Sequence, residues 1–200
     1  AGWNPGPASV PDIVGPVEFR GRLGLCSSQS ASFAESCSQG RRLPGVALGL
    51  WGRVVWLRIL ILNPPASDGS SYIREGRCMQ SRSSWTELFP PITLMYLSSS
   101  LRAQGFEVRL VDAVAQGFSW ERSLRLAGEV AADLLVLNTA FPSIHSDMAF
   151  AQACRDQQPA LRTVALGVFP TLLPAECLQG FPGLDFAVVG EPERAVVMLA

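Results

Sequence analysis

The sequence contains no lysine and only one histidine, and each absence excludes a class of chemistry. Because all sixteen basic residues are arginine, neither a lysine Schiff base nor the lysine of a phosphate-binding P-loop can arise within these 200 residues. His145 alone cannot form a multi-histidine metal site, and a single histidine also disfavours a Ser-His-Asp triad.

The cysteines are too far apart to encode a metal site. No CxxC or CxxxCxxC spacing occurs, so we expect this segment itself to bind neither zinc nor an iron–sulfur cluster. An odd number of scattered cysteines suits a reducing compartment better than a disulfide scaffold, which favours a cytoplasmic location. The five are Cys26, Cys37, Cys78, Cys154 and Cys177.

Charge and long apolar runs are also scarce. The net charge is −1 and charged residues make up 16% of the chain, so we expect no nucleic-acid partner and no polybasic membrane patch. No apolar run reaches the about eighteen residues that a membrane span needs, so we expect no membrane partner. The hydrophobic fraction of 48% is nevertheless enough for one sizeable core.

Residues 1–52 differ from the rest of the chain. They are crowded with proline, glycine and serine, and they show neither strand nor helix periodicity over a useful length. Such a composition cannot bury enough apolar surface to offset the entropy of ordering. We therefore predict a disordered or non-native extension over 1–52, followed by one folded domain over 53–200.

From residue 54 onward, strand and helix patterns alternate regularly. Five units of a strand followed by a helix predict a parallel sheet covered on both faces. We expect a doubly wound, Rossmann-like α/β fold with the flavodoxin-like strand order 2-1-3-4-5. The predicted strands are 54–62, 107–112, 133–139, 162–167 and 185–190, and the predicted helices are 91–104, 119–132, 145–157, 174–178 and one from 193.

The long loop after the first strand is the strongest candidate for a ligand site. It is polar and contains glycine, and an open α/β sheet binds ligands at the carboxyl ends of its strands. The expected strand order also places this loop beside the one after Thr139. Its candidate cofactor-binding residues are Asn63, Pro64, Pro65, Tyr72, Arg74, Arg77 and Cys78.

The other strand ends carry small and hydroxyl residues. These let the backbone approach a large flat ligand closely, although they would also suit ordinary turns. No GxGxxG follows the first strand and no GxxxxGK[ST] occurs, which disfavours the usual nucleotide loops. The candidates here are Asp112, Thr139, Phe141, Ser143, Gly167, Val168, Phe169, Thr171, Gly190 and Glu191.

Five segments in order, ILILNPP, EGRC, PPITLMYLSSSLRAQGFEVRLVDA, LGVFPTLLP and LDFAVVGEPE, carry a family resemblance. Residues 54–200 resemble the amino-terminal cobalamin-binding domain of the cobalamin-dependent radical S-adenosylmethionine enzymes. The resemblance implies a sheet that holds the corrinoid and precedes a barrel with a [4Fe–4S] cluster and S-adenosylmethionine. It implies the cofactor domain of a methyltransferase or cyclase-type enzyme, truncated at its carboxyl end and not catalytically complete by itself.

The sequence departs from related patterns at three places. The turn that usually reads Gly-Gly is Gly167-Val168 here, and the added bulk would hinder a corrinoid's nucleotide tail. Pro192 replaces the second glycine of a GEGE-like turn. The segment after the first strand is NPPASDG rather than DxHxxG, so no histidine is expected below cobalt. Tyr72, Arg74, Arg77 and Cys78 are then the candidates by location to face cobalt from below.

Two alternatives remain open from the sequence. A flavodoxin-like nucleotide-binding or regulatory domain would share the sheet without a corrinoid. It would need a phosphate-cradling loop after the first strand, where Asn63-Pro64-Pro65 instead removes two amide donors. The chain could also be a fragment that binds nothing. We expect His145 to be a capping or surface residue, and Cys154 and Cys177 to pack inside helices.

Overall fold

The computed structural model describes residues 19–21, 46–48, 54–70, 72–74 and 89–200. Its centre is a parallel sheet in the order β5-β4-β6-β7-β8, which confirms the predicted flavodoxin-like order. A short antiparallel strand, β1, adds to the β8 edge and was not predicted. The strands are β1 (Phe19–Gly21), β4 (Arg58–Asn63), β5 (Glu107–Asp112), β6 (Leu134–Thr139), β7 (Arg162–Gly167) and β8 (Phe186–Val188).

The first predicted strand, 54–62, is divided in two. Val54–Trp56 forms β3 and pairs with β2 (Val46–Leu48) in a separate two-stranded sheet, while Arg58–Asn63 forms β4 of the main sheet. Periodicity cannot reveal this division, because both halves are equally apolar. Strands β1 and β2 lie within the segment predicted as an extension, and its other residues lie outside the described part of the chain.

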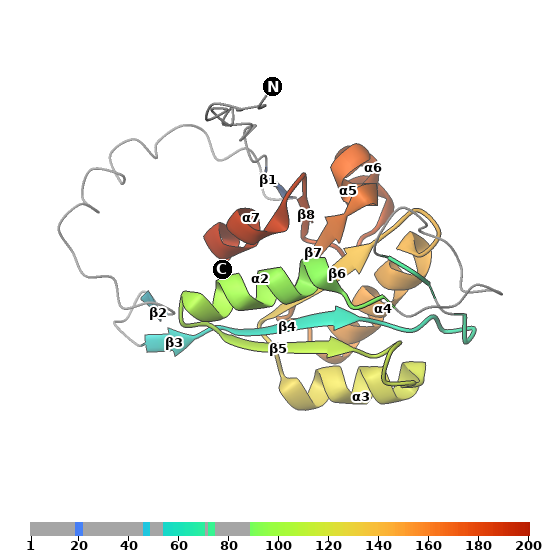
Figure 1. The fold of residues 1–200 in the computed structure, drawn as a ribbon, viewed down its shortest axis with the longest axis horizontal. Helices are drawn as coiled ribbons and strands as arrows, with labels where there is room; N and C mark the ends of the chain where they lie inside the picture. Colours follow the sequence, from blue (N-terminus) through green and yellow to red (C-terminus); the bar gives the residue numbers. More distant parts are fainter. Residues whose placement is uncertain (1–18, 22–45, 49–53, 71, 75–88) are drawn as a thin grey trace, which may run out of the picture.

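Helices cover both faces of the sheet (Figure 1). On one face, α2 (Ile92–Ala103) packs beside α7 (Pro192–Leu199). On the other face, α3 (Trp120–Val130) packs beside α4 (Ile144–Gln157). Two short helices, α5 (Val168–Leu172) and α6 (Pro174–Gly180), follow β7. Only the second of these was predicted.

The core has two layers because successive strand residues point to opposite faces. Leu60 and Leu62 join the layer under α3 and α4, whereas Ile59 and Ile61 join the layer under α2 and α7. Strand β6 is buried along its whole length, as expected for a parallel strand covered on both sides.

Both described cysteines belong to the core, as the helical pattern predicts. Burial raises the pKa of Cys154 to about 12 and that of Cys177 to about 11. Both thiols therefore stay protonated at neutral pH and serve as packing groups. In the part of the chain that the structure describes, no helix is long and apolar enough to cross a membrane.

Candidate functional site

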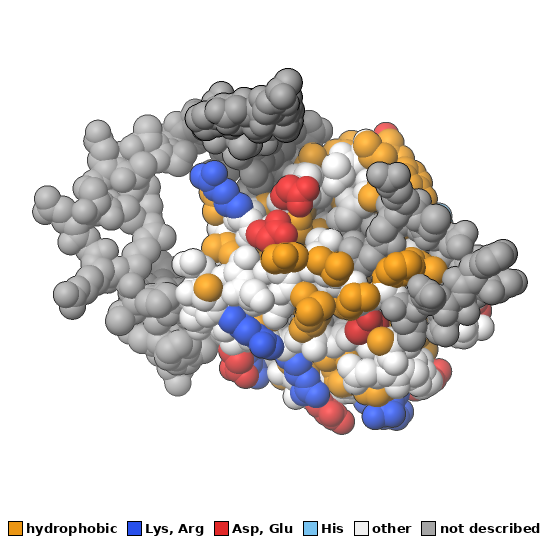
Figure 2. All heavy atoms as spheres, viewed as in Figure 1, with side chains coloured by type: hydrophobic (Ala, Val, Ile, Leu, Met, Phe, Trp, Pro, Cys, Tyr) orange, Lys and Arg blue, Asp and Glu red, His pale blue; other side chains and the backbone are white. Residues whose placement is uncertain are grey.

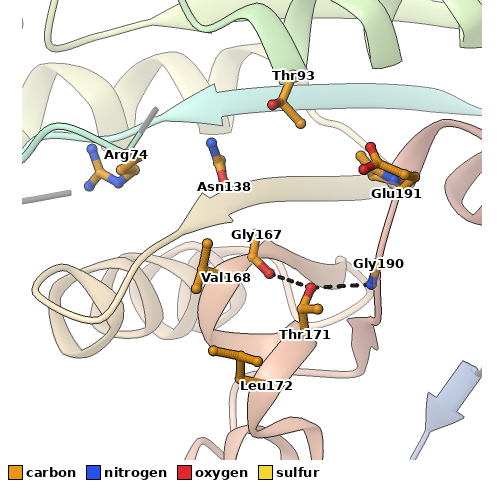
Figure 3. Close-up of a pocket in the computed structure, with 10 residues that line it drawn as sticks. Arg74, Thr93, Asn138, Gly167, Val168, Thr171, Leu172, Gly190 and Glu191 are labelled. Carbon is orange, nitrogen blue, oxygen red and sulfur yellow. Dashed lines mark hydrogen bonds between the residues drawn. The ribbon is translucent and has the colours of Figure 1, made fainter. Parts of the chain in front are cut away.

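The carboxyl ends of the parallel strands converge on one edge of the sheet, and a cleft of about 380 Å³ opens there. It lies between the start of α2 on one side and α5 on the other, with the turn after β8 closing one end (Figure 3). The residues that line it are Arg74, Thr93, Asn138, Gly167, Val168, Thr171, Leu172, Gly190, Glu191 and Pro192.

Gly167 ends β7 in a backbone conformation that only glycine adopts readily, with φ +108° and ψ −161°. A Cβ atom at this position would collide with the backbone carbonyl oxygen of Thr139 and lie 2.5 Å from Asn138 Oδ1. The close approach of β6 and β7 at this end of the sheet therefore requires a residue without a side chain at position 167.

Thr171 joins two walls of the cleft. Its hydroxyl donates to the Gly167 carbonyl at 2.6 Å and accepts from the Gly190 amide at 3.2 Å (Figure 3). Gly190 has φ +80°, so the turn after β8 also uses the left-handed region. One side chain thus connects the end of β7, the helix α5 and the turn after β8.

On the β4 side, the site is built from a buried ion pair. The Arg74 side chain is 1% exposed and that of Asp147 is 0% exposed. Arg74 Nη2 lies 2.5 Å from Asp147 Oδ1, and Arg74 Nε donates to Oδ2 at 3.2 Å. The same guanidinium donates to Asn63 Oδ1 at 2.6 Å and to the Pro64 carbonyl at 3.0 Å. The loop after β4 is therefore tied to α4.

The ion pair extends into a network at the start of α4. The Ser143 hydroxyl donates to Asp147 Oδ2 at 2.6 Å, and the same hydroxyl accepts from the Ala140 amide at 3.1 Å. Burial raises the pKa of Asp147, while the Arg74 charge and the hydrogen bonds from Arg74 and Ser143 oppose that rise. Each buried polar atom of this pair thus has a partner, as a buried charge requires.

The end of β5 belongs to the same network. Asn63 Nδ2 donates to Asp112 Oδ1 at 3.0 Å, and that oxygen also accepts from the Ala115 amide at 3.0 Å. Asn63 therefore bridges Asp112 and Arg74, so side chains from two neighbouring strands and α4 are held together. The arrangement positions the loop rather than leaving a charge free for chemistry.

An aromatic shelf lies beside the cleft. Phe141 is 49% exposed and its ring centroid lies 5.3 Å from that of Phe169. Phe169 in turn contacts Phe181, and the His145 ring centroid lies 5.5 Å from that of Phe181. Leu172, at 62% exposure, adds apolar surface at the cleft mouth. Figure 2 shows further apolar side chains exposed over α2.

The structure brings most of the predicted site residues to this edge. They line the cleft, belong to the hydrogen-bonded network, form the aromatic shelf or lie buried below these groups. Thr139 is buried beneath the cleft and donates to the Leu166 carbonyl at 3.0 Å, and Pro65 is also buried. The Arg74 guanidinium lies 5.7 Å from the Tyr72 ring centroid. Arg77 and Cys78 lie outside the described residues. Cleft-lining residues are Arg74, Gly167, Val168, Thr171, Gly190 and Glu191, network residues are Asn63, Pro64, Asp112 and Ser143, and shelf residues are Phe141 and Phe169.

Several residues of this candidate site were not predicted. Asp147 was missed, although a carboxylate four residues after Ser143 on a helix faces the same side as that serine. Asn138 was also missed, and a polar residue inside an apolar strand could have indicated it. Thr93, Leu172 and Pro192 had no such signal. His145 is exposed at the start of α4, as predicted, and no group of three potential metal ligands occurs among the described residues.

Comparison with known proteins gives a family match and several relatives. The family described as "B12 binding domain" matches residues 84–200, more than half of the chain. The chain is similar to anaerobic magnesium-protoporphyrin IX monomethyl ester cyclases from Synechocystis, at 30% identity over 145 residues, and from Rubrivivax gelatinosus, at 24% over 144. Each match covers 72% of this chain but only 27% and 24% of the respective relatives. The chain thus spans about a quarter of the length of these relatives.

Proposed function

We propose that this chain, which belongs to the B12-binding domain family, holds a cobalamin at the carboxyl edge of its sheet, with the nucleotide tail in the cleft. The cleft is the observation that carries this placement. Its lining combines glycine backbone, two threonines, an asparagine and apolar side chains with one glutamate and one arginine, and the arginine is already paired with Asp147. Such a mixed lining suits a flat heterocycle and a ribose better than a highly charged group.

The rim around the cleft fits the ring of the same cofactor. Phe141 and Leu172 expose apolar surface where the broad face of a corrin would lie. Arg74 lies at the end of the cleft away from Gly190 and Glu191 (Figure 3).

The segment after β4 lacks the histidine of a DxHxxG pattern, and the one histidine of the chain lies on α4. His145 contacts Phe181 and is exposed. Arg74 is unsuited to that role, because its guanidinium is a cation already held by four hydrogen bonds. We therefore propose a lower cobalt face without protein imidazole, with Tyr72, Arg77 and Cys78 as the remaining candidates from the loop.

For the whole protein we propose a cobalamin-dependent radical S-adenosylmethionine enzyme of the cyclase type. The names of the similar proteins favour a cyclase over a methyltransferase. The [4Fe–4S] cluster and S-adenosylmethionine would belong to another domain, because the cysteine spacing here cannot hold a cluster. This domain would then supply cofactor binding and orientation.

The test is anaerobic reconstitution with hydroxocobalamin, followed by gel filtration and an absorbance spectrum. We expect co-elution of one corrinoid with a spectrum that lacks histidine ligation. Cobinamide, which lacks the nucleotide tail, should bind more weakly. Absence of co-eluting corrinoid would defeat the proposal. Equal affinity for cobinamide would show that the nucleotide tail does not bind in the cleft.

Val168 offers a sharper version of this test. It lines the cleft where added bulk should hinder the tail. We expect Val168→Ala to bind hydroxocobalamin several-fold more tightly and to leave cobinamide affinity unchanged. Val197→Ala on α7, which does not line the cleft, is the matched control for loss of two methyl groups. An equal gain for both corrinoids would contradict the placement of the tail.

A further inference from the structure

A second, separate groove lies at the opposite side of the sheet from β8, along the edge strand β5. A cavity of about 480 Å³ is bounded by β5, the loop after it and α3, and a smaller cavity of about 260 Å³ continues along the same strand. Arg109 and Glu129 line both cavities, so the two form one groove running along β5. None of its residues lines the cleft described above.

The groove carries an excess of positive charge. Arg109 from β5 and Arg122 and Arg125 from α3 line the larger cavity, where Glu129 is the only carboxylate among the residues that the structure describes. None of these three arginines forms an ion pair within the described ranges of the chain. Figure 2 shows arginine side chains along the edge where Figure 1 places β5 and α3, with acidic ones among them. This local excess stands against a net charge of −1 for the whole chain.

One of the arginines is held in place without a carboxylate. The Arg122 guanidinium lies 3.7 Å from the centroid of the Phe118 ring, which fixes its plane at the groove wall. Stacking on an aromatic ring leaves the N–H groups at the guanidinium edge available to an anion. The groove thus contains a pre-positioned donor, which lowers the entropic cost of binding a carboxylate there.

The backbone of β5 offers unpaired groups to the same groove. The Ala113 amide donates to the Asn63 carbonyl at 3.1 Å. The backbone N–H and C=O groups of every second residue before Ala113 therefore also face β4. The backbone groups of Val108, Leu110 and Asp112 face away from β4, toward the free edge of the sheet. Arg102 donates to the Val108 carbonyl at 2.8 Å, and the Asp112 carbonyl accepts from the Gln116 amide at 3.1 Å. Both backbone groups of Leu110 have no partner among the residues that the structure describes.

We propose that this groove binds an acidic peptide segment in extended conformation, which adds as a strand beside Leu110. An unpaired strand edge is a template for strand addition, in which backbone bonds give affinity and side-chain contacts give specificity. Side chains of the added strand alternate between faces, so every second residue would meet Arg109, Arg122 and Arg125 on the α3 side. The segment should therefore carry carboxylates at alternate positions. A second copy of this chain fits less well, because pairing β5 with β5 brings the arginines of two copies together.

The probe is a fluorescently labelled nonapeptide with glutamate at every second position and threonine between. Fluorescence anisotropy with the full chain should show saturable binding that weakens as salt is raised. The triple variant Arg109→Glu, Arg122→Glu and Arg125→Glu should lower the affinity about tenfold or more. Arg194→Glu on α7, an exposed arginine outside the groove, is the matched control and should change it less than twofold.

Two further peptides separate strand addition from simple charge attraction. A peptide with proline at its central position cannot donate one backbone bond, and it should bind several-fold more weakly. A peptide with lysine for glutamate should not bind. Equal binding of the proline peptide, an unchanged affinity for the triple variant, or dimerisation of the free chain through this edge would each overturn the proposal. Corrinoid co-elution of the triple variant should match the unmodified chain, which also confirms that the variant is folded.

Discussion

The two sides of the carboxyl edge are built on opposite principles. On the anchored side, formed by Asn63, Arg74, Asp112, Ser143 and Asp147, charged and polar side chains satisfy one another in a buried network. On the open side, formed by Gly167, Val168, Thr171, Leu172 and Gly190, the surfaces are backbone, glycine and small groups around a cleft. We expect the anchored side to act on stability alone, and the open side to act on corrinoid affinity and, where β6 and β7 approach closely, on stability too.

The largest expected effect is on the anchored side. Asp147→Asn removes the charge that neutralises a buried arginine, so the free energy of unfolding should fall by about 3–5 kcal/mol. Urea denaturation followed by circular dichroism would measure it. Asp156→Asn, an exposed position on the same helix that accepts from Gln152, should cost less than about 0.5 kcal/mol. Similar losses for both variants would show that the ion pair of Asp147 with Arg74 does not contribute specially to stability.

Gly167→Ala tests whether the open side is purely a binding surface. The new Cβ would collide with the Thr139 carbonyl, in a conformation already unfavourable for alanine, so we expect a loss of about 3 kcal/mol. Gly190→Ala is the matched control, because that glycine also has positive φ but no atom lies within 4 Å of its would-be Cβ. It should cost about 1–2 kcal/mol from backbone strain alone. Equal losses of unfolding free energy would show that the contact of the new Cβ with the Thr139 carbonyl adds nothing to the cost of backbone strain.

Thr171→Val should have an intermediate effect. It removes the two hydrogen bonds that join Gly167 and Gly190, and it should lower the free energy of unfolding by about 1–2 kcal/mol. Corrinoid affinity should fall more clearly than stability, because the cleft walls lose their connection. Thr171→Ser keeps the hydroxyl and should restore both properties, so a serine variant as impaired as the valine variant would contradict this role.

Leu172→Ser should have the smallest effect on stability. The residue is 62% exposed, so the change in unfolding free energy should stay within about 0.5 kcal/mol. Hydroxocobalamin affinity should nevertheless fall several-fold if the corrin covers this side chain. Met198→Ser, at 64% exposure on α7 and outside the cleft, should leave that affinity unchanged. An unchanged affinity for Leu172→Ser would place the corrin elsewhere on the edge.

The fold could be predicted from the sequence because parallel α/β units are locally specified. Each apolar strand is followed by a helical pattern with its own start and stop signals, such as Ser119, which caps α3 by accepting from the Arg122 amide. Helix α5 escaped prediction because it is only five residues long and contains Pro170. Its existence moves Val168 and Thr171 from a loop onto a helix that forms one wall of the cleft.

The sequence predicted which residues gather at this edge of the sheet, but not how they pair with one another. Glycines and polar residues at strand ends indicated the edge, because parallel strands bring their carboxyl ends together. The loop after Asn63 was expected to offer Arg74 to a ligand. In the structure that arginine instead forms a buried ion pair with Asp147, which is 73 residues away in the chain.

The sequence by itself determined the order of the five parallel strands and the absence of lysine, histidine pairs and cluster spacing, and it predicted the edge at which a ligand would bind, since these depend on local pattern and composition. Only the tertiary structure decided which charges neutralise one another. It buries Arg74 against Asp147 and leaves Arg109 exposed at the free edge of the sheet. The physical reason is that burial and charge pairing are properties of neighbours in space. Arg109 and Arg74 are therefore alike in chemistry and different in burial and charge pairing.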